Sequence, residues 1–298
     1  MAELLFTASF SGAFRGVIEG VIELIQISDC HLFKDKSKVG YGEIAPYQSL
    51  ETVLRQVSQR IRLSKTKCAP DDAEHQTDDV VQAVTVILVT GDITGDDTHE
   101  SYMHFLSLMS QHIDSIGVDW YVIAGNHDNN PHFERIFAKR ILCSGHPVTI
   151  GDWQVHGMDT RCASEPHSAK GEVNSHDVRM VSRAIEQASS KHHLVALHHH
   201  IKPSNSWMDK HRLFNAERID AMASKYTQIK GFIHGHVHHP LRQQVGEHET
   251  PSFGSPSTCW QWKMQTTFGV SESNPGYQVI QLHSDGGLSC EVYRTAFA

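Results

Sequence analysis

The sequence lacks the features that mark disulfide-stapled, zinc-ribbon or membrane proteins. Its 298 residues include six cysteines without a Cys-x-x-Cys pair, namely Cys30, Cys68, Cys143, Cys162, Cys259 and Cys290. So sparse a set in a chain of this length predicts reduced, buried thiols and no disulfide framework. No apolar run approaches the ~18 residues of a membrane-spanning helix, so we expect no membrane partner.

A surplus of basic residues is also absent. The chain has 26 Lys and Arg against 34 Asp and Glu, which gives a net charge of -8. Because a nucleic-acid partner requires a basic surface, we expect none here. Residues 1–13 carry Glu3 where a secretory signal would be basic, and their longest apolar run is 4–6. We therefore expect a cytoplasmic protein.

Strand-like and helix-like segments alternate along most of the chain. The apolar, strand-like segments are 23–28, 84–90, 119–124, 193–197 and 229–233. Helical spacing of apolar residues begins at Tyr47 and recurs over 102–116, 131–142, 178–188 and 216–226. A hairpin is expected over 146–159, and the chain from Leu241 is β-rich without a helix.

We find neither an internal repeat nor a linker between domains. Residues 65–79 are polar, acidic and aperiodic, which predicts a mobile surface insertion. The alternating order of elements favours one layered α/β domain over residues 1–298.

Polar side chains follow five of the predicted strands, at the point where each strand ends. They are Asp29 and His31, Asp92, Asn126 to Asp128, His198, and His236 with His238. The 23 histidines exceed ordinary usage, and those at 198–200 and 234–239 are clustered. Because open α/β sheets bind substrates at the carboxyl ends of their strands, we expect these side chains to share one site.

The spacing and chemistry of these residues indicate a metal site. Residues i and i+2 of an extended chain point the same way, so the Asp-x-His and His-x-His pairs can each converge on an ion. Carboxylate, imidazole and amide ligands together suit manganese, iron or zinc. The set is too large for one ion and fits two ions ~3.5–4 Å apart with a shared carboxylate, as in two-metal hydrolases.

Each fragment also has an ordinary structural interpretation. A lone Asp-x-His or Gly-Asp pair is usually a surface turn, and residues 125–128 have the composition of many tight turns. The histidines at 198–200 could be solvated or bind adventitious metal. Five such fragments, each directly after a predicted strand, make coincidence a poor explanation and favour an active site.

The order of the fragments resembles that of a known family. Over residues 23–239 the chain is similar to the five blocks of the calcineurin-like metallophosphoesterases, which correspond to Asp29-Cys-His31, Gly91-Asp92, Gly125-Asn126-His127-Asp128, His198 and Gly235-His236-Val-His238. The resemblance implies an α/β fold, a four-layer αββα sandwich of two mixed β-sheets flanked by helices. It also implies a binuclear metal site at the strand ends.

The same resemblance implies a role for each residue. One of two divalent ions (iron, manganese or zinc) would be held by Asp29, His31, Asp92 and His238, and the other by Asp92, Asn126, His198 and His236. A hydroxide between the ions would attack phosphorus, and His127 would protonate the leaving oxygen or hydrogen-bond the phosphoryl group. Asp92, the implied bridge, and His127 are thus the implied catalytic residues. The residues implied to contact substrate are His31, Asp92, Asn126, His127 and His238. Asp128 is expected to support the turn.

Further segments resemble one subgroup of this family, the bacterial class III cyclic nucleotide phosphodiesterases. They are 197–200, 206–209, 213–216 and 255–259, together with Gln261 and Lys263. The implied reaction is hydrolysis of a small-molecule substrate, 3′,5′-cyclic AMP, to 5′-AMP. The chain departs from the subgroup at Ile201, where a proline is usual, at Gly42-Glu43 in place of Asn-Thr, and in the 65–79 insertion.

Several residues near the blocks have more than one interpretation. By the subgroup resemblance, Trp207, Asn215, Trp260 and Trp262 are candidate nucleobase or rim contacts, although packing is the commoner role for such side chains and is the one we favour. His199, His200 and His239 flank the implied ligands and are expected to support them or to gate substrate.

Two other functions stay open at this point. A broader phosphodiesterase would act on 2′,3′-cyclic nucleotides or glycerophosphodiesters, because the metals supply the chemistry and the rim selects the substrate. A non-catalytic, metal-dependent scaffold is disfavoured, since no implied ligand is missing and His127 is present. The sequence predicts neither the oligomeric state nor which metal is bound.

Overall fold

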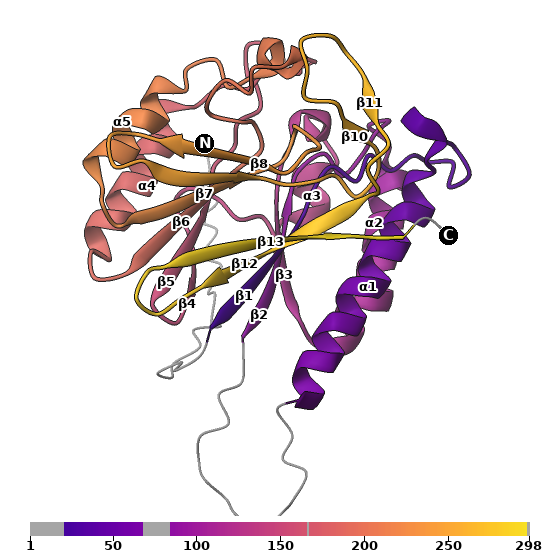
Figure 1. Ribbon diagram of the computed structural model, residues 1–298, viewed down its shortest axis with the longest axis horizontal. Coiled ribbons are helices and arrows are strands. Elements are labelled where there is room, and N and C mark those ends of the chain that lie inside the picture. The colour runs from indigo at the N-terminus through magenta and orange to yellow at the C-terminus, as the bar shows by residue number, and fades with distance from the viewer. Residues whose placement is uncertain (1–20, 68–83, 166, 297–298) are drawn as a thin grey trace, which may run out of the picture.

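The computed structural model describes residues 21–67, 84–165 and 167–296. Within these residues the predicted alternation of strands and helices is confirmed (Figure 1). The predicted insertion at 65–79 lies mostly outside them. Its first residues belong to the end of α1 (Pro46–Lys67) and are therefore helical, contrary to the prediction.

The first large sheet has five strands in the order β13-β12-β1-β2-β3. Strands β1 (Ile22–Ile27), β2 (Thr85–Thr90) and β3 (Asp119–Ile123) run parallel. The chain returns to this sheet at its end, where β12 (Gly276–Leu282) pairs antiparallel with β1 and β13 (Leu288–Arg294) pairs antiparallel with β12. β1, near the start of the described residues, and β12 and β13, near their end, thus belong to one sheet.

The second large sheet has six strands in the order β4-β5-β6-β7-β9-β8. Its centre is parallel and comprises β5 (Trp153–Gly157), β6 (His192–Leu197), β7 (Ile229–His234) and β9 (Thr250–Gly254). Its edges, β4 (Val148–Ile150) and β8 (Leu241–Val245), are antiparallel. The predicted hairpin at 146–159 is the β4–β5 pair. A third, two-stranded sheet joins β10 (Gln261–Trp262) to β11 (Val270–Ser271).

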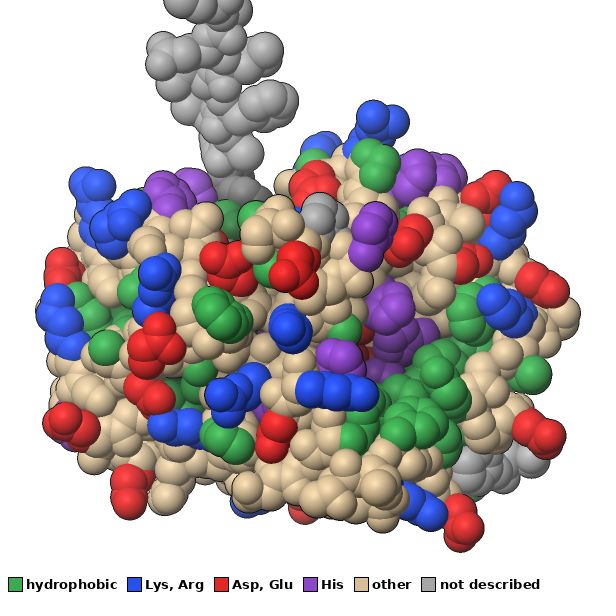
Figure 2. Space-filling view, turned by 90° about the horizontal axis from the view of Figure 1, so that it is seen from above, with side chains coloured by type: hydrophobic (Ala, Val, Ile, Leu, Met, Phe, Trp, Pro, Cys, Tyr) green, Lys and Arg blue, Asp and Glu red, His purple; other side chains and the backbone are tan. Residues whose placement is uncertain are grey.

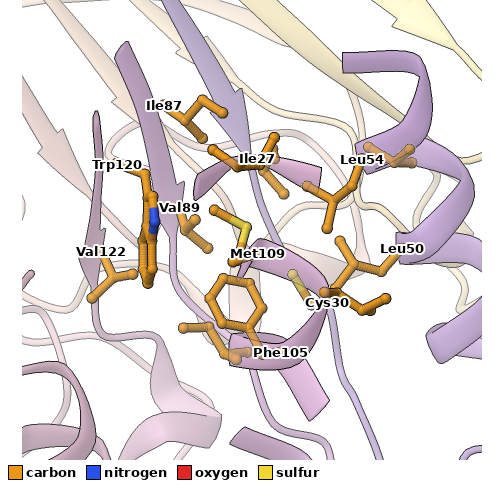
Figure 3. Packing of buried hydrophobic residues seen from close by; sticks show 14 of the residues in the cluster. Ile27, Cys30, Leu50, Leu54, Ile87, Val89, Phe105, Met109, Trp120 and Val122 are labelled. Atoms are coloured by element: carbon orange, nitrogen blue, oxygen red, sulfur yellow. The ribbon is translucent and has the colours of Figure 1, made fainter. Parts of the chain in front are cut away.

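Helices cover the outer face of each large sheet. Against the first sheet lie α1, α2 (His99–His112) and the short α3 (Phe133–Phe137), and a buried cluster joins them to the strands. Figure 3 shows Phe105 and Met109 of α2 meeting Trp120 and Val89 of the strands. Burying such side chains contributes about 1.5–3 kcal/mol each, which holds the helices on the sheet.

The second sheet is also covered by helices on its outer face and buries apolar residues on its inner face. Helices α4 (Ser175–Gln187) and α5 (Glu217–Lys225) pack on the outer face of the second sheet through Val181, Ile185 and Ile219. Between the two sheets lies an apolar core that includes Leu24, Leu88 and Leu194. Two mixed sheets flanked by helices confirm the expected αββα sandwich (Figure 1).

Two expectations are corrected by the structure. A helix was predicted over 131–142, but the observed helix is only α3. Residues 140–142 instead run beside β3, where Leu142 N donates to Val122 O at 2.8 Å. The cysteines that the structure describes form no disulfide, as expected, but only Cys30 and Cys259 are buried and Cys143 is exposed.

No helix among the described residues is long and apolar enough to cross a membrane.

Candidate metal centre

The carboxyl ends of five strands from both large sheets meet at one place. Asp29 and His31 follow β1, Asp92 follows β2, Asn126 follows β3, His198 follows β6, and His236 with His238 follow β7. Figure 2 shows histidine side chains gathered in a hollow beside a hydrophobic patch on this face. All of these residues except the half-buried Asn126 are buried.

The backbone at the site differs from the extended chain that the sequence interpretation assumed. Five candidate ligands have left-handed backbone angles, with φ of 55° at Asp29, 45° at His31, 53° at Asp92, 68° at His236 and 44° at His238. The convergence of each i, i+2 pair therefore does not come from strand geometry. Asp and His adopt this region more readily than most residues, and strained residues of this kind cluster at functional sites.

One group of three side chains joins the two sheets. Nε2 of His238 lies 3.0 Å from Nε2 of His31 and 3.4 Å from Oδ1 of Asp29. One ligand atom from each of the three lies within 4.8 Å of the others. The carboxylate of Asp29 also accepts from the backbone N–H of His236 at 3.1 Å, which ties β1 to β7.

A second group shares the same centre. Asp92, His198 and His236 also each offer an atom within 4.8 Å of the others, and Nε2 of His198 lies 3.3 Å from Oδ2 of Asp92. The same carboxylate oxygen lies 3.7 Å from Nε2 of His31 in the first group. Asp92 thus stands between the two groups.

The hydrogen bonds of the histidines show that these groups fit a cation. Nδ1 of His198 donates to Thr90 O at 2.7 Å, and Nδ1 of His238 donates to Trp260 O at 2.9 Å. Because Nδ1 is the donor in both rings, Nε2 is the atom that faces the carboxylates, and a positive charge at that position, either a proton or a metal ion, is favourable. Such carbonyl partners are what orient metal-ligating histidines in proteins.

Two buried atoms with no hydrogen-bond partner support the same fit. They are Oδ1 of Asn126 and Nε2 of His198. Leaving a buried polar atom unpaired costs about 1–3 kcal/mol, so such atoms call for a ligand. Carboxylate, imidazole and amide donors together suit a divalent transition metal.

Charges inside the site shift its pKa values in opposite directions. Burial would raise the pKa of Asp92, but the charges of His198 and His127 hold it well below its usual range. Burial would lower the pKa of His198, but Asp92 raises it to about 9. Burial lowers the pKa of His31 to about 3. The carboxylates therefore stay ionised and attract positive charge.

The turn at Asn126–Asp128 divides its residues between two tasks. Asp128 is buried and accepts from the backbone N–H of Gly125 at 2.9 Å and from the hydroxyl of Tyr102 at 2.9 Å, so its expected role as a turn support is confirmed. His127 is exposed, and its backbone N–H donates to Oδ1 of Asp92 at 2.8 Å. Its ring meets that of His31 edge-on, with 4.9 Å between centroids.

A cavity of about 540 Å³ opens above the centre. His127 and Asp92 line its floor, and Trp207, Trp260 and Trp262 line its wall. Trp260 stacks on His31 with 5.2 Å between centroids, and Trp262 stacks on His238 at 4.8 Å.

Trp260 and Trp262 therefore pack against the rings of two candidate ligands, His31 and His238, as well as lining the cavity. Asn215 lies outside the cavity lining, where its amide bonds both backbone groups of Val173. The rings of His199 and His200 bond Thr160 and Asp209, and neither belongs to a metal-binding group. His239, which is half-buried and follows the candidate ligand His238, is likewise outside these groups.

Sequence reasoning missed several residues around the site. Lys38 and Phe33 line the cavity, and nothing in the aperiodic loop that contains Lys38 marks it. Gln26 and Thr90 lie beneath the site as buried polar residues. The sequence did carry a signal for Gln26, because a Gln within the apolar run 22–27 needs a hydrogen-bonding partner.

Comparison with known proteins agrees with this geometry. Residues 22–240 match the family described as calcineurin-like phosphoesterase. The chain is 29% identical over 275 residues to the 3′,5′-cyclic adenosine monophosphate phosphodiesterase CpdA of Haemophilus influenzae, which covers 91% of this chain and 89% of that protein. It is 25% identical over 277 residues to a 3′,5′-cyclic-nucleotide phosphodiesterase of a Nostoc species, covering 92% and 93%.

Solved structures share the fold at low sequence identity. A dimetal phosphatase from Danio rerio superposes with a TM-score of 0.61 at 12% identity, covering 93% of this chain and 99% of that one. A purple acid phosphatase from yellow lupin superposes with a TM-score of 0.58 at 11% identity, covering 93% and 52%. The family match spans most of the chain, and the chain belongs to the calcineurin-like phosphoesterase family.

Proposed function

We propose that the protein is a metal-dependent phosphodiesterase that hydrolyses 3′,5′-cyclic AMP to 5′-AMP. The observation that carries the proposal is the cavity of about 540 Å³, which places an aromatic wall directly above the buried carboxylate–histidine centre. Small-molecule sites are commonly ~300–1,000 Å³ and mostly apolar with a few placed polar groups. The relatives named as cyclic nucleotide phosphodiesterases support this choice of substrate.

The residues of the centre would hold two divalent ions of iron, manganese or zinc. Asp29, His31 and His238 would bind one, Asn126, His198 and His236 would bind the other, and Asp92 would contact both. When bound, such ions lower the pKa of water to supply a nucleophile near neutral pH and neutralise charge on phosphoryl oxygens.

His127 is the proposed acid of the reaction. Water oxygen forms a new bond to phosphorus, the bond from phosphorus to the sugar 3′ oxygen breaks, and that oxygen needs a proton. The backbone of His127 is fixed by its bond to Asp92, while its exposed ring faces the cavity. The ring can therefore deliver a proton to the leaving oxygen, and we assign it this role although one of its nitrogens also lies within 4.8 Å of ligand atoms of His31 and Asp92.

Lys38 is proposed to attract the anionic substrate. Its ammonium lies 4.0 Å from the centre of the Phe33 ring at the cavity wall. Lys34 in the same loop pairs with Glu100, and Lys36 reaches the hydroxyl of Tyr47. The charge of Lys38 acts on Asp35, but Lys38 forms no ion pair within 4 Å among the described residues. A lysine ammonium at the mouth would raise the local concentration of a phosphate ester.

The aromatic wall is proposed to receive the nucleobase. Trp207 is half-buried, and its ring meets Phe268 at 5.0 Å and Trp262 at 5.5 Å. Tyr41 closes the same group and is half-exposed. Since Trp260 and Trp262 already stack on histidines, Trp207 and Tyr41 have the rings available to a base.

The proposal treats residues 1–298 as one metallophosphoesterase domain. Supporting it, the β12–β13 hairpin near the end of the chain completes the sheet that β1 begins, and the candidate ligands come from both sheets. A separated half would lack part of the centre.

A substrate panel tests the proposal. Protein loaded with manganese or iron is assayed on 3′,5′-cyclic AMP, 2′,3′-cyclic AMP and a glycerophosphodiester. The proposal predicts the highest kcat/KM on 3′,5′-cyclic AMP. Higher values on either other ester would favour the broader phosphodiesterase, and no turnover on any would favour the scaffold.

A further inference from the structure

A row of polar side chains interrupts the core between the two sheets directly below the metal centre. On β1 the residues facing this core are Ile22 and Leu24, and the next one is Gln26. On β2 the last such residue is Thr90, and on β12 it is Gln278, the direct register partner of Gln26. Gln26 and Gln278 are thus level with each other, whereas the register partner of Gln26 on β2 is the apolar Leu88 and Thr90 lies two residues further along that strand. The core between the sheets therefore becomes polar just before the ligand loops of β1 and β2.

The hydrogen bonds in this row have fixed directions. Nε2 of Gln278 donates to Oε1 of Gln26 at 2.7 Å, so Nε2 of Gln26 is its donor end. That nitrogen donates to Oγ1 of Thr90 at 2.9 Å and to the backbone oxygen of His234 at 3.0 Å. Thr90 Oγ1 then donates to Oγ of Ser28 at 2.8 Å. The amide of Gln26 uses its acceptor and both donors.

These contacts connect the strand residues that lie just before the candidate ligands. Thr90 precedes Asp92 by two residues, and its carbonyl accepts from Nδ1 of His198. His234 precedes His236 by two residues and lies in the other sheet. The Gln26 amide therefore joins the strand that carries Asp92 to the strand that carries His236, through a buried side chain with no exposed surface.

We propose that Gln26 is a positioning residue for the metal centre, acting through Thr90 and His234. The inference rests on the proposed function, because it assumes that the centre binds metal. Each ion would need ligands from both sheets, so a small change in sheet separation would spoil both sets. Partners behind the ligands of metal sites typically change affinity ~10–100-fold when removed.

The test measures Mn²⁺ affinity of metal-stripped full-length protein by titration calorimetry, together with the thermal midpoint of the metal-free form. Gln26→Met keeps the length of the side chain and removes its hydrogen bonds. Thr90→Val, a smaller change, removes only the side-chain link and serves if Gln26→Met fails to fold. Leu24→Ala is the matched control, since Leu24 lies two residues earlier on the same strand and faces the same core.

We expect Gln26→Met to weaken Mn²⁺ binding ~10–100-fold and Thr90→Val to weaken it less, as seen when partners behind metal ligands are removed. Leu24→Ala should lower the thermal midpoint and keep the wild-type affinity. Wild-type affinity in Gln26→Met, or in Thr90→Val where only that variant folds, would overturn the inference, as would an equal loss in Leu24→Ala. Failure of the wild-type protein to bind Mn²⁺ would instead overturn the proposed function on which it rests.

Discussion

Oδ2 of Asp92 lies 3.3 Å from Nε2 of His198, and both groups are buried. The other oxygen of Asp92 accepts from the backbone N–H of His127 at 2.8 Å. One carboxylate thus meets the buried histidine and the residue proposed as the acid. Its position between the two groups of candidate ligands makes it the residue on which the centre depends most.

Asp92→Asn is expected to abolish binding of two ions. An amide is neutral and cannot serve two cations as a carboxylate does. Affinity should therefore fall by at least ~100-fold, which is the largest loss typical of removing a hydrogen-bond partner of a ligand and not the ligand itself. Metal content after dialysis, measured by mass spectrometry, checks this. Asp96→Asn is the control, because Asp96 bonds the backbone of Lys34 and Thr98 outside the centre. Two tightly held ions in Asp92→Asn would refute the bridging assignment.

His127→Ala should separate chemistry from metal binding. The ring is proposed only to supply a proton, so kcat should fall ~10²–10⁴-fold, the usual contribution of a general acid. The bond from its backbone N–H to Asp92 survives the substitution, and two ions should remain bound. Unchanged turnover, or loss of metal, would remove His127 from this role.

Lys38→Met should raise KM for cyclic AMP and leave kcat unchanged. Losing one charge–charge attraction at an exposed site costs up to about 1 kcal/mol, which corresponds to about fivefold in affinity. The effect should shrink as salt is added, because screening already weakens the attraction. Lys36→Met is the control, since Lys36 belongs to the same loop but reaches Tyr47. Equal KM values for both variants would contradict the role of Lys38.

The strands and the strand-end residues were predictable because both leave local signals. Continuous apolar runs such as 85–90 mark strands buried on both faces, and Asp and His directly after them stand out. The helix at 131–142 was wrong beyond α3 because Leu142 bonds β3, a tertiary contact that helical spacing does not reveal.

The geometry of the site was less predictable than its composition. The positive φ angles of Asp29 and His31 depend on loops held by distant segments, as in the bond from Ser257 Oγ to Asp29 O at 2.8 Å. The cavity wall combines Lys38, Trp207 and Trp262, which are far apart in sequence. Such a set becomes visible only once the chain has folded.

Acid should destabilise the fold through a buried histidine pair away from the centre. His193 Nε2 donates to Ala188 O at 3.1 Å, so its Nδ1 accepts from Nε2 of His156 at 2.8 Å and both rings are neutral. Burial lowers the pKa of His156 to about 3. Since the unfolded chain protonates near pH ~6.5, stability from this group is present above that pH and lost as pH falls toward 3.

Urea unfolding of metal-free protein between pH 7 and pH 4 measures this effect. His156→Gln keeps a donor for His193 and should reduce the slope of unfolding free energy by up to about 1.4 kcal/mol per pH unit. His176→Gln, at an exposed position on α4, is the control and should keep the wild-type slope. An unchanged slope in His156→Gln would show that this pair does not sense acid.

The most direct test of the central claim is phosphate-ester turnover by one preparation with its metal content known. Protein stripped of metal and then loaded with Mn²⁺ or Fe²⁺ is assayed by following conversion of 3′,5′-cyclic AMP to 5′-AMP. Two ions per chain are expected, with turnover that appears with the metal and disappears on chelation. Two bound ions without hydrolysis of 3′,5′-cyclic AMP, or hydrolysis that survives complete metal removal, would contradict it.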